Sequence, residues 1–193
     1  MPARTNHSES RPSDVELYYR MGADPHVAKL AFEELYHRFG PGVYRYCYRV
    51  IGNQRMAEDV FQETFINFYE SARGERVMIN VEAYLLRIAR NLSLNAKKSK
   101  HNDTLPIEQF DPPADEFSYE RKETDQLVVA ALDSLPADYR EALVLREYNG
   151  LSYSEISNVV GASVATVRIR IFRAKRKLRG MLTPYLTDLL DHD

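Results

Sequence analysis

The sequence predicts an all-α protein in which two small helical domains are joined by a flexible acidic linker. Apolar residues recur at helical spacing on both sides of the middle of the chain, glycine and proline are scarce there, and no stretch alternates as a strand does. The middle differs, because residues 101–126 carry eight acidic and two basic side chains and include three prolines. We expect an N-terminal extension over 1–25, an N-terminal helical bundle over 26–100, the linker over 101–117, a C-terminal helix-turn-helix domain over 118–186 and an acidic tail over 187–193.

The composition excludes several classes of protein. No run approaches the roughly 20 apolar residues of a membrane-spanning helix, and the first residues lack the apolar centre of a signal peptide. The single cysteine, Cys47, rules out an internal disulfide. Its place among apolar and aromatic neighbours predicts burial rather than reactivity. We expect a cytoplasmic protein with no membrane insertion and no cofactor.

Four helices are predicted in the N-terminal domain. The pattern over 27–39 runs into Gly40 and Pro41, so one helix is expected to end there and a second to run from Pro41 to about Ile51. The third helix covers 56–72 and the fourth about 81–98. The third is expected to bury Ala57, Phe61, Thr64, Phe65, Phe68 and Ala72, and the fourth Val81, Leu85, Ile88, Ala89, Leu92 and Ala96.

The outer face of the third helix is acidic with one apolar residue at its centre. It presents Asp59, Gln62, Glu63, Ile66 and Glu70. Such a face suits docking onto a basic protein surface, with the isoleucine as the anchor. A solvated polar face is the alternative that these residues leave open.

The outer face of the fourth helix is basic. Its candidate nucleic-acid contacts are Arg87, Arg90, Asn91, Lys97 and Lys98, together with Asn80 from the loop over 74–80. Basic groups, amides and nearby aromatic rings (Tyr69 and Tyr84) are typical of surfaces that bind single-stranded nucleic acid. Tyrosines at helical spacing are also ordinary core residues, so the rings carry little of this prediction.

The C-terminal domain contains a helix-turn-helix pattern. A first helix is expected over about 135–148. The next begins at Ser152 as N-cap with Glu155 three positions on, which forms a capping box, and ends at Gly161. Ser163 then caps a further helix after a very short turn. Two helices around a tight glycine turn are typical of a DNA-binding helix-turn-helix.

The helix that begins after Ser163 is strongly basic. Residues 168–179 hold seven basic side chains and no acidic one, and a helix of this width fits the DNA major groove. Its inward stripe is Val164, Val167, Ile171, Ala174 and Leu178. Its candidate DNA contacts are Ser163, Ala165, Thr166, Arg168, Ile169, Arg173, Arg176 and Lys177. Thr166 and Arg168 are expected near base edges, and the later basic residues near phosphates.

Ile169 and Phe172 are apolar residues on this outward face. They are expected to contact a thymine methyl group or a protein partner, or else to pack against the segment 181–190. The sequence leaves these alternatives open.

Five segments together resemble the extracytoplasmic-function (ECF) group of bacterial sigma factors. They are 57–65 (AEDVFQETF), 83–91 (AYLLRIARN), 135–141 (LPADYRE), 150–156 (GLSYSEI) and 161–175 (GASVATVRIRIFRAK). They follow the family order over about residues 28–180, with a variable linker where the family has one. Tyr84 stands where the family usually has tryptophan. Lys97 and Lys98 stand where it has arginines, which favours phosphate contacts there.

The resemblance implies a protein that binds core RNA polymerase and directs it to promoter DNA. It implies that the face of Asp59, Gln62 and Glu63 docks on the clamp coiled coil of the largest polymerase subunit, and that the C-terminal domain touches the flap. The fourth helix with its preceding loop would capture the melted −10 strand, and the helix after Ser163 would read the −35 element as duplex. It also implies an anti-sigma factor that covers the polymerase-binding faces.

Two other functions fit parts of the sequence. A stand-alone helix-turn-helix regulator would explain the C-terminal domain but would leave the acidic face and the second basic face without a role. A metal-dependent DNA enzyme would need a third carboxylate beside Asp59 and Glu63, and the five scattered histidines give no zinc-ligand spacing. The sequence therefore favours a transcription initiation factor that is not an enzyme and holds no metal.

Overall fold

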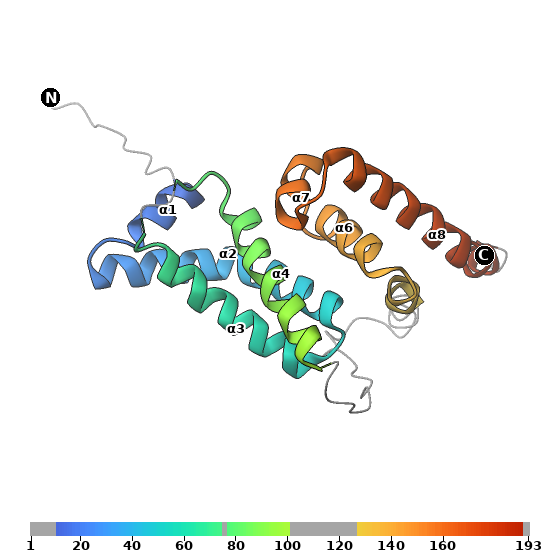
Figure 1. Ribbon diagram of the computed structural model, residues 1–193, viewed down its shortest axis with the longest axis horizontal. Helices are drawn as coiled ribbons and strands as arrows, with labels where there is room; N and C mark the ends of the chain where they lie inside the picture. Colours follow the sequence, from blue (N-terminus) through green and yellow to red (C-terminus); the bar gives the residue numbers. More distant parts are fainter. Residues whose placement is uncertain (1–10, 75–76, 101–126, 191–193) are drawn as a thin grey trace, which may run out of the picture.

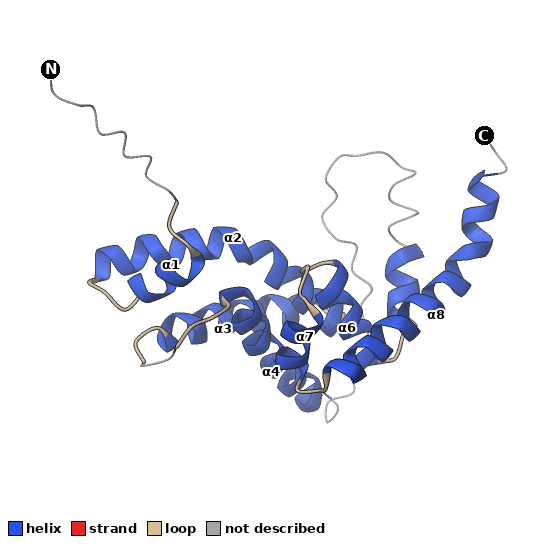
Figure 2. Cartoon of the chain, turned by 90° about the horizontal axis from the view of Figure 1, so that it is seen from above, coloured by secondary structure: helices blue, strands red, loops and turns tan. Residues whose placement is uncertain are grey.

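The computed structural model describes residues 11–74, 77–100 and 127–190, with side chains in the last two ranges described as far as Ala96 and Tyr185. Within these ranges the chain forms helices and loops and no strand, so the predicted all-α class is confirmed (Figure 2). None of the described helices is long and apolar enough to cross a membrane. The predicted linker over 101–117 lies outside the described residues.

Four helices form the N-terminal bundle (Figure 1). They are α1 (Asp14–Arg20), α2 (Pro25–Ile51), α3 (Gln54–Ser71) and α4 (Val81–Lys100). Helices α2, α3 and α4 each pack against the other two, and α1 packs on α2. The shared core includes Leu35, Val43, Tyr46, Phe65, Phe68, Leu85 and Ala89. The predicted inward faces of α3 and α4 are the ones that this core buries.

The predicted break at Gly40 and Pro41 is wrong, because α2 is one helix from Pro25 to Ile51 with Pro41 inside it. A proline inside a helix removes one backbone hydrogen bond and crowds the preceding turn. Here Gly40 is buried, and Leu35 before it and Val43 after it both lie in the core. Burial on both sides of the proline offsets the local cost, so tertiary packing overrides the sequence signal for a helix end.

Helix α1 was not among the predicted helices. Ser13 caps it, and Glu16 completes a capping box by accepting hydrogen bonds from the Ser13 backbone N–H at 2.7 Å and hydroxyl at 2.9 Å. Leu17, Tyr18 and Met21 lie in the core. With only seven residues, α1 is too short to show a helical period in the sequence, although the Ser-x-x-Glu spacing was a readable signal.

The C-terminal half contains helical residues 127–133, then α6 (Ala137–Glu147), α7 (Tyr153–Val160) and α8 (Val164–Leu190). The predicted capping box of Ser152 and Glu155 is present, and Gly161 ends α7 in the left-handed region with φ of 66°. The Thr166 N–H donates to the Ser163 hydroxyl at 3.1 Å, which confirms the predicted cap of α8. The helix-turn-helix is therefore formed by the residues that predicted it.

Helix α8 runs without interruption to Leu190, so residues 181–190 continue its axis. The predicted inward residues Val167, Ile171 and Ala174 are buried. Phe172 is 66% exposed and Ile169 is 50% exposed, so the suggested packing of these two against 181–190 is wrong. A continuous helix cannot fold its own end back onto its outer face.

The two halves are in contact. Helix α4 packs against α7, and α2 packs against α6. Glu141 of α6 is 7% exposed, and its carboxylate accepts hydrogen bonds from the Tyr46 hydroxyl at 2.8 Å and from Arg90 Nε at 2.9 Å. The Arg49 guanidinium lies 4.4 Å from the centre of the Tyr148 ring. One hydrophobic core extends through both halves.

The contact between the halves explains a second buried face on α4. Leu86 and Ser93 are both 0% exposed, although the sequence predicted only the face that includes Leu85 and Ala89 as buried. Leu86, Arg90 and Ser93 share a helical stripe because they are four and three residues apart. Leu86 and Ser93 are fully buried and Arg90 is partly buried, although this stripe lies outside the predicted core face of the N-terminal bundle.

Candidate nucleic-acid and protein-docking surfaces

The outward side of α8 forms the first candidate surface, which we call the recognition surface. The candidates Ser163, Ala165, Arg168, Ile169, Arg173, Arg176 and Lys177 are exposed, and Thr166 is half-buried. The short turn at Gly161 sets α8 against α7, so the first residues of α8 stand at the protein surface. The exposed side of the helix thus carries polar and apolar groups in its first turns and mainly basic groups from Arg173 onward.

Contacts with α6 and α7 distinguish the basic residues of α8. Arg170 pairs with Asp138 at 3.0 Å and Lys175 pairs with Glu147 at 2.8 Å. Arg168, in contrast, stacks on the Tyr153 ring with its guanidinium carbon 5.4 Å from the ring centre. Arg173 donates to the Tyr139 hydroxyl at 3.1 Å. The two candidate arginines are held by aromatic side chains, so their positive charge is not neutralised by these partners.

The second candidate surface, on α4, is smaller than predicted. Arg87 and Asn91 are exposed as expected. Arg90 is turned to the C-terminal half, where it pairs with Glu141. The Asn80 side chain accepts from the Ala83 N–H at 2.8 Å and donates to Glu155 of α7. Partners in the C-terminal half therefore hold Asn80 and Arg90, whereas Arg87 and Asn91 remain exposed on α4. The side chains of Lys97 and Lys98 lie outside those described.

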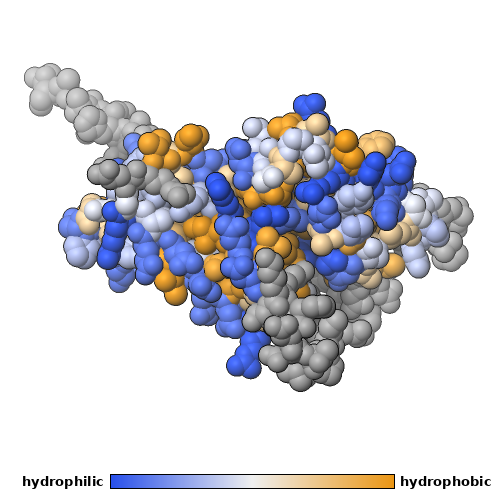
Figure 3. Space-filling model, viewed as in Figure 1, coloured by the Kyte–Doolittle hydropathy of each residue, from blue (hydrophilic) through white to orange (hydrophobic). Residues whose placement is uncertain are grey.

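The loop ahead of α4 presents apolar side chains that the sequence analysis did not single out. Val77 is 80% exposed and Ile79 is 86% exposed, whereas Met78 between them is 6% exposed. Orange side chains mark the edge of the molecule beside α1 in Figure 3, where Figure 1 places this loop. We call residues 77–80 the strand loop; the word refers to a nucleic-acid strand, since these residues form no β-strand.

The third candidate surface is the acidic face of α3. Asp59, Gln62, Glu63 and Ile66 are all exposed, with Ile66 at 58%. A groove of about 530 Å³ adjoins this face, between α2 and α3, and its lining was missed by sequence reasoning. The lining residues are Lys29, Phe32, Tyr36, Phe61, Gln62, Phe65, Ile66, Tyr69 and Glu70. The aromatic residues Phe32 and Tyr36, spaced four apart on α2, were the available signal.

The cysteine thiol takes no part in these surfaces. Cys47 is fully buried, and burial raises its pKa to about 12. A thiol with that pKa is protonated at neutral pH, and the thiolate is the reactive form. The predicted role of Cys47 as a core residue is confirmed.

Comparison with known proteins identifies the family of the chain. Residues 35–102 match sigma-70 region 2, and residues 125–178 match sigma-70 region 4. The RNA polymerase sigma-H factor of Pseudomonas aeruginosa is 32% identical over 174 residues, which cover 83% of this chain and 90% of that protein. The ECF RNA polymerase sigma-E factor of Haemophilus influenzae is 32% identical over 147 residues, which cover 66% of this chain and 75% of that protein. The chain belongs to the ECF sigma factors.

The other comparisons of this ECF sigma factor agree. It is 36% identical to the ECF sigma factor SigE of Mycolicibacterium smegmatis, but it spans only 65% of the length of that relative. Two solved structures share its fold. The sigma factor RpoE bound to the anti-sigma factor NepR from Bartonella quintana covers 79% of this chain and 96% of its own, with TM-score 0.67 at 23% identity. CnrH bound to the cytosolic domain of CnrY covers 89% of this chain and 97% of its own, with TM-score 0.68 at 24% identity.

Family membership decides between the functions that the sequence left open. Both matched regions lie in order on one chain, and each half of this ECF sigma factor carries one of them. A stand-alone helix-turn-helix regulator would account for the second match alone. The protein is a promoter-specific transcription initiation factor of the sigma-70 type.

Proposed function

We propose that this sigma factor docks on core RNA polymerase through α3, reads the −35 element as duplex with α8 and holds the melted −10 strand with α4 and the strand loop. The observation that carries the proposal is the recognition surface. A capped helix-turn-helix presents exposed basic residues there, among them Arg168, Arg173 and Arg176, while Arg170 and Lys175 pair with carboxylates of α6. The protein acts in the cytoplasm as a binding factor without catalytic residues.

The order of side chains on α8 supports a division of labour along the −35 element. Thr166 and Arg168 lie in the first turns, and residues at the start of a recognition helix reach base edges. Arg173, Arg176 and Lys177 lie one to three turns further on, where phosphates run past the helix. Stacking on Tyr153 limits the motion of Arg168, which lowers the entropy lost when its guanidinium binds a base.

The docking role of α3 is supported by the groove beside its acidic face. Ile66 lies at the edge of a groove lined with aromatic rings, and Glu63 and Asp59 precede it on α3 by about one and two turns respectively. An apolar anchor surrounded by charges is the usual composition of a protein interface. The partner would present apolar side chains to the groove and basic side chains to the carboxylates, as a helix of a coiled coil can do.

In-vitro transcription with core polymerase and a genomic DNA library tests the whole proposal. We expect transcripts whose start sites share two upstream sequence elements, one for each half of the protein. Gel-shift experiments with and without core polymerase complete the test, because the proposal requires polymerase for tight specific binding. Tight specific binding of the isolated protein to an operator, without polymerase-dependent transcription, would contradict it.

The docking surface has its own test. We expect the double variant Asp59→Lys/Glu63→Lys to reduce affinity for core polymerase by at least about tenfold, roughly 1.4 kcal/mol, because like charges then oppose each other. Glu147→Lys is the matched control, since it reverses a carboxylate on α6, away from the docking surface. Unchanged assembly of the holoenzyme by the double variant would remove α3 from the proposal.

An anti-sigma factor is the second partner that we propose. One structure of the same fold contains a sigma factor bound to the anti-sigma factor NepR. The apolar groove between α2 and α3 and the adjacent acidic face would be covered by such a protein, which would compete with polymerase for them.

A further inference from the structure

The strand loop presents two apolar side chains to solvent in a fixed geometry. Val77 and Ile79 are the most exposed of the large apolar residues in the described part of the chain, at 80% and 86%. Met78 between them is 6% exposed, so the loop buries its middle side chain and leaves the two on either side in solvent. Exposed apolar groups that stand together mark a contact site.

Met78 is fixed by a bond from outside the loop. Its backbone N–H donates to the phenolic oxygen of Tyr19 on α1 at 2.9 Å, across 59 residues of sequence. The Tyr19 ring stands edge-on to the Tyr18 ring, with 5.7 Å between their centres. A phenylalanine at position 19 would keep the ring and lose the acceptor, so the bond can be removed without removing packing.

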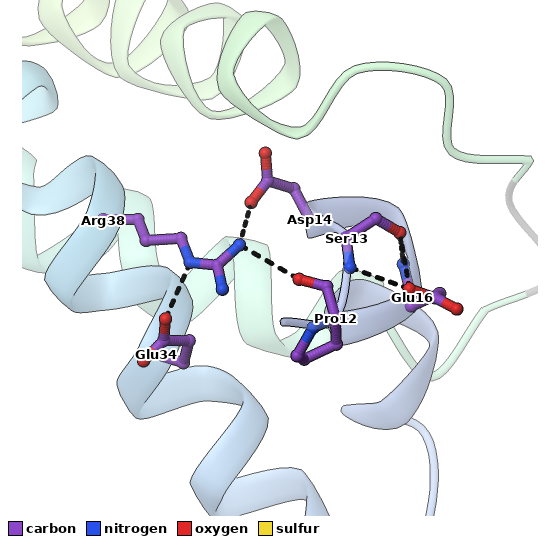
Figure 4. A network of polar contacts seen from close by, with 6 residues as sticks. All are labelled: Pro12, Ser13, Asp14, Glu16, Glu34 and Arg38. Carbon is purple, nitrogen blue, oxygen red and sulfur yellow. Dashed lines mark hydrogen bonds and ion pairs between the residues drawn. The ribbon is translucent and has the colours of Figure 1, made fainter. Parts of the chain in front are cut away.

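Helix α1 is itself firmly held. Arg38 of α2 reaches its start, where Nη1 lies 2.6 Å from Asp14 Oδ1 and donates to the Pro12 carbonyl at 3.2 Å (Figure 4). The same guanidinium donates through Nε to Glu34 at 2.8 Å. The buried Tyr18 hydroxyl donates to the Ser71 carbonyl at 2.9 Å, at the end of α3. Tyr19 therefore extends from a helix tied to both α2 and α3.

The far end of the strand loop is held by α4. Asn80 accepts from the Ala83 N–H at 2.8 Å, which fixes the loop at the first turn of the helix. Arg87 and Asn91 are exposed further along α4. The loop thus holds its apolar tips at the N-terminal end of a helix with exposed polar and basic groups.

We propose that Tyr19 is a positioning residue for promoter opening: its hydroxyl holds the strand loop so that Val77 and Ile79 pack against one unstacked base of the melted −10 strand. The inference rests on the proposed function and deepens it. Unstacked bases are bound through their faces, and phosphates by nearby cations, so apolar side chains at the start of the helix that exposes Arg87 match a single strand of DNA. The residue acts through Met78 and does not itself touch the DNA.

The test measures the affinity of the holoenzyme for forked promoter DNA, which has a duplex −35 element and a single-stranded −10 segment. We expect Tyr19→Phe to weaken this binding about threefold to tenfold, which corresponds to the loss of one backbone hydrogen bond. Val77→Ser/Ile79→Ser is expected to weaken it at least as much, and Ile79→Val to leave it unchanged. Tyr185→Phe is the matched control, because Tyr185 on α8 has the same 51% exposure as Tyr19.

A series of forked DNAs with one abasic position each separates positioning from general destabilisation. One abasic position should remove the base that the loop holds. On that fork the affinity of the wild type should fall to the affinity that Tyr19→Phe has for the intact fork, and the affinity of Tyr19→Phe should not fall further, because coupled changes are not additive. At every other abasic position, the loss of binding free energy from the missing base and the loss from Tyr19→Phe should add.

Three outcomes would overturn the inference. They are equal affinity of Tyr19→Phe and wild type for every fork, additive losses at all positions, or a defect of Tyr19→Phe in binding core polymerase, which would make the loop a protein contact. If the wild-type holoenzyme binds no forked promoter, the proposed function itself fails. If it binds and the variant matches it, only the role of Tyr19 fails.

Discussion

The arginines of α8 show how far the role of a single residue follows from its contacts. Their positions along the helix were readable from the sequence, and the structure adds which of them have acidic partners. Arg170 pairs with Asp138, whereas Arg168 stacks on Tyr153 and carries no carboxylate partner among its described contacts. A helical wheel drawn from the sequence cannot distinguish an arginine with a carboxylate partner from one without, because the partner residues lie on other helices.

Arg168 and Arg176 should differ in what they contribute to promoter binding. We expect Arg168→Ala to cost about 1–3 kcal/mol and to relax the preference at one base pair of the −35 element. Arg176→Ala should weaken binding to all sequences alike and reduce the salt dependence by about one phosphate contact. Holoenzyme affinities for single-base-pair variants, measured over a range of salt, provide the check. A loss of base preference in Arg176→Ala alone would reverse the assignment.

Cys47 makes the free energy of unfolding depend on pH in the alkaline range. Burial raises its folded-state pKa from 9.0 to about 12, so folding favours the protonated thiol. The associated stability is fully present below about pH 9 and is lost as the pH rises towards 12. At about pH 10.5 we expect wild type to have lost roughly 2 kcal/mol more than Cys47→Ala, each relative to its own stability at neutral pH. Urea unfolding across this range measures the difference, and parallel curves would contradict it.

At the scale of elements, capping residues predicted the structure best. Ser152, Glu155 and Gly161 define α7, and the structure has each of them in the predicted role. Pro41 misled, because its effect on a helix end is local while the burial of α2 on both sides of it is not. The aromatic groove was missed for a related reason. Its walls come from two helices, and the sequence of either one alone shows only a core pattern.

Two glycines offer opposite effects on the helix-turn-helix. Gly161 has φ of 66°, and an L-residue in the left-handed region costs about 1–2 kcal/mol, so Gly161→Ala should destabilise the protein by that amount. Gly180 lies inside α8, where an added Cβ would meet no atom within 4 Å, so Gly180→Ala should stabilise the protein by about 0.5–1 kcal/mol. Thermal or urea unfolding of the two variants measures both changes in stability. Changes of the same sign in Gly161→Ala and Gly180→Ala would contradict the prediction.

At the scale of the whole molecule, the contact between the halves is the feature that no sequence pattern predicted. Glu141 lies 51 residues from Arg90 and 95 from Tyr46, and nothing local indicates that they meet. Asn80 and Arg90, both candidates for the −10 strand, are held by Glu155 and Glu141. Capture of the strand through these atoms and closure of the two halves therefore compete.

That competition is measurable in the isolated protein. We expect Glu141→Gln to lower the free energy of unfolding by about 1.5–3 kcal/mol, the range for a hydrogen bond to a charged group, and to raise affinity for single-stranded −10 DNA several-fold. Asp133→Asn is the matched control, because Asp133 pairs with Arg140 inside the C-terminal half. Equal affinity of the wild type and Glu141→Gln for single-stranded −10 DNA would contradict the competition between strand capture and closure of the two halves.

Helix α1 has a practical consequence for work with shortened proteins. A version that began at Met21 would retain both matched regions, 35–102 and 125–178, and would therefore satisfy any definition of the protein by family boundaries. It would nevertheless lack Tyr18 and Tyr19, and with them the bonds to Ser71 and Met78. With the role that we propose for Tyr19, trimming to the matched regions would weaken promoter opening even though the proposed docking face of α3 stays in the chain.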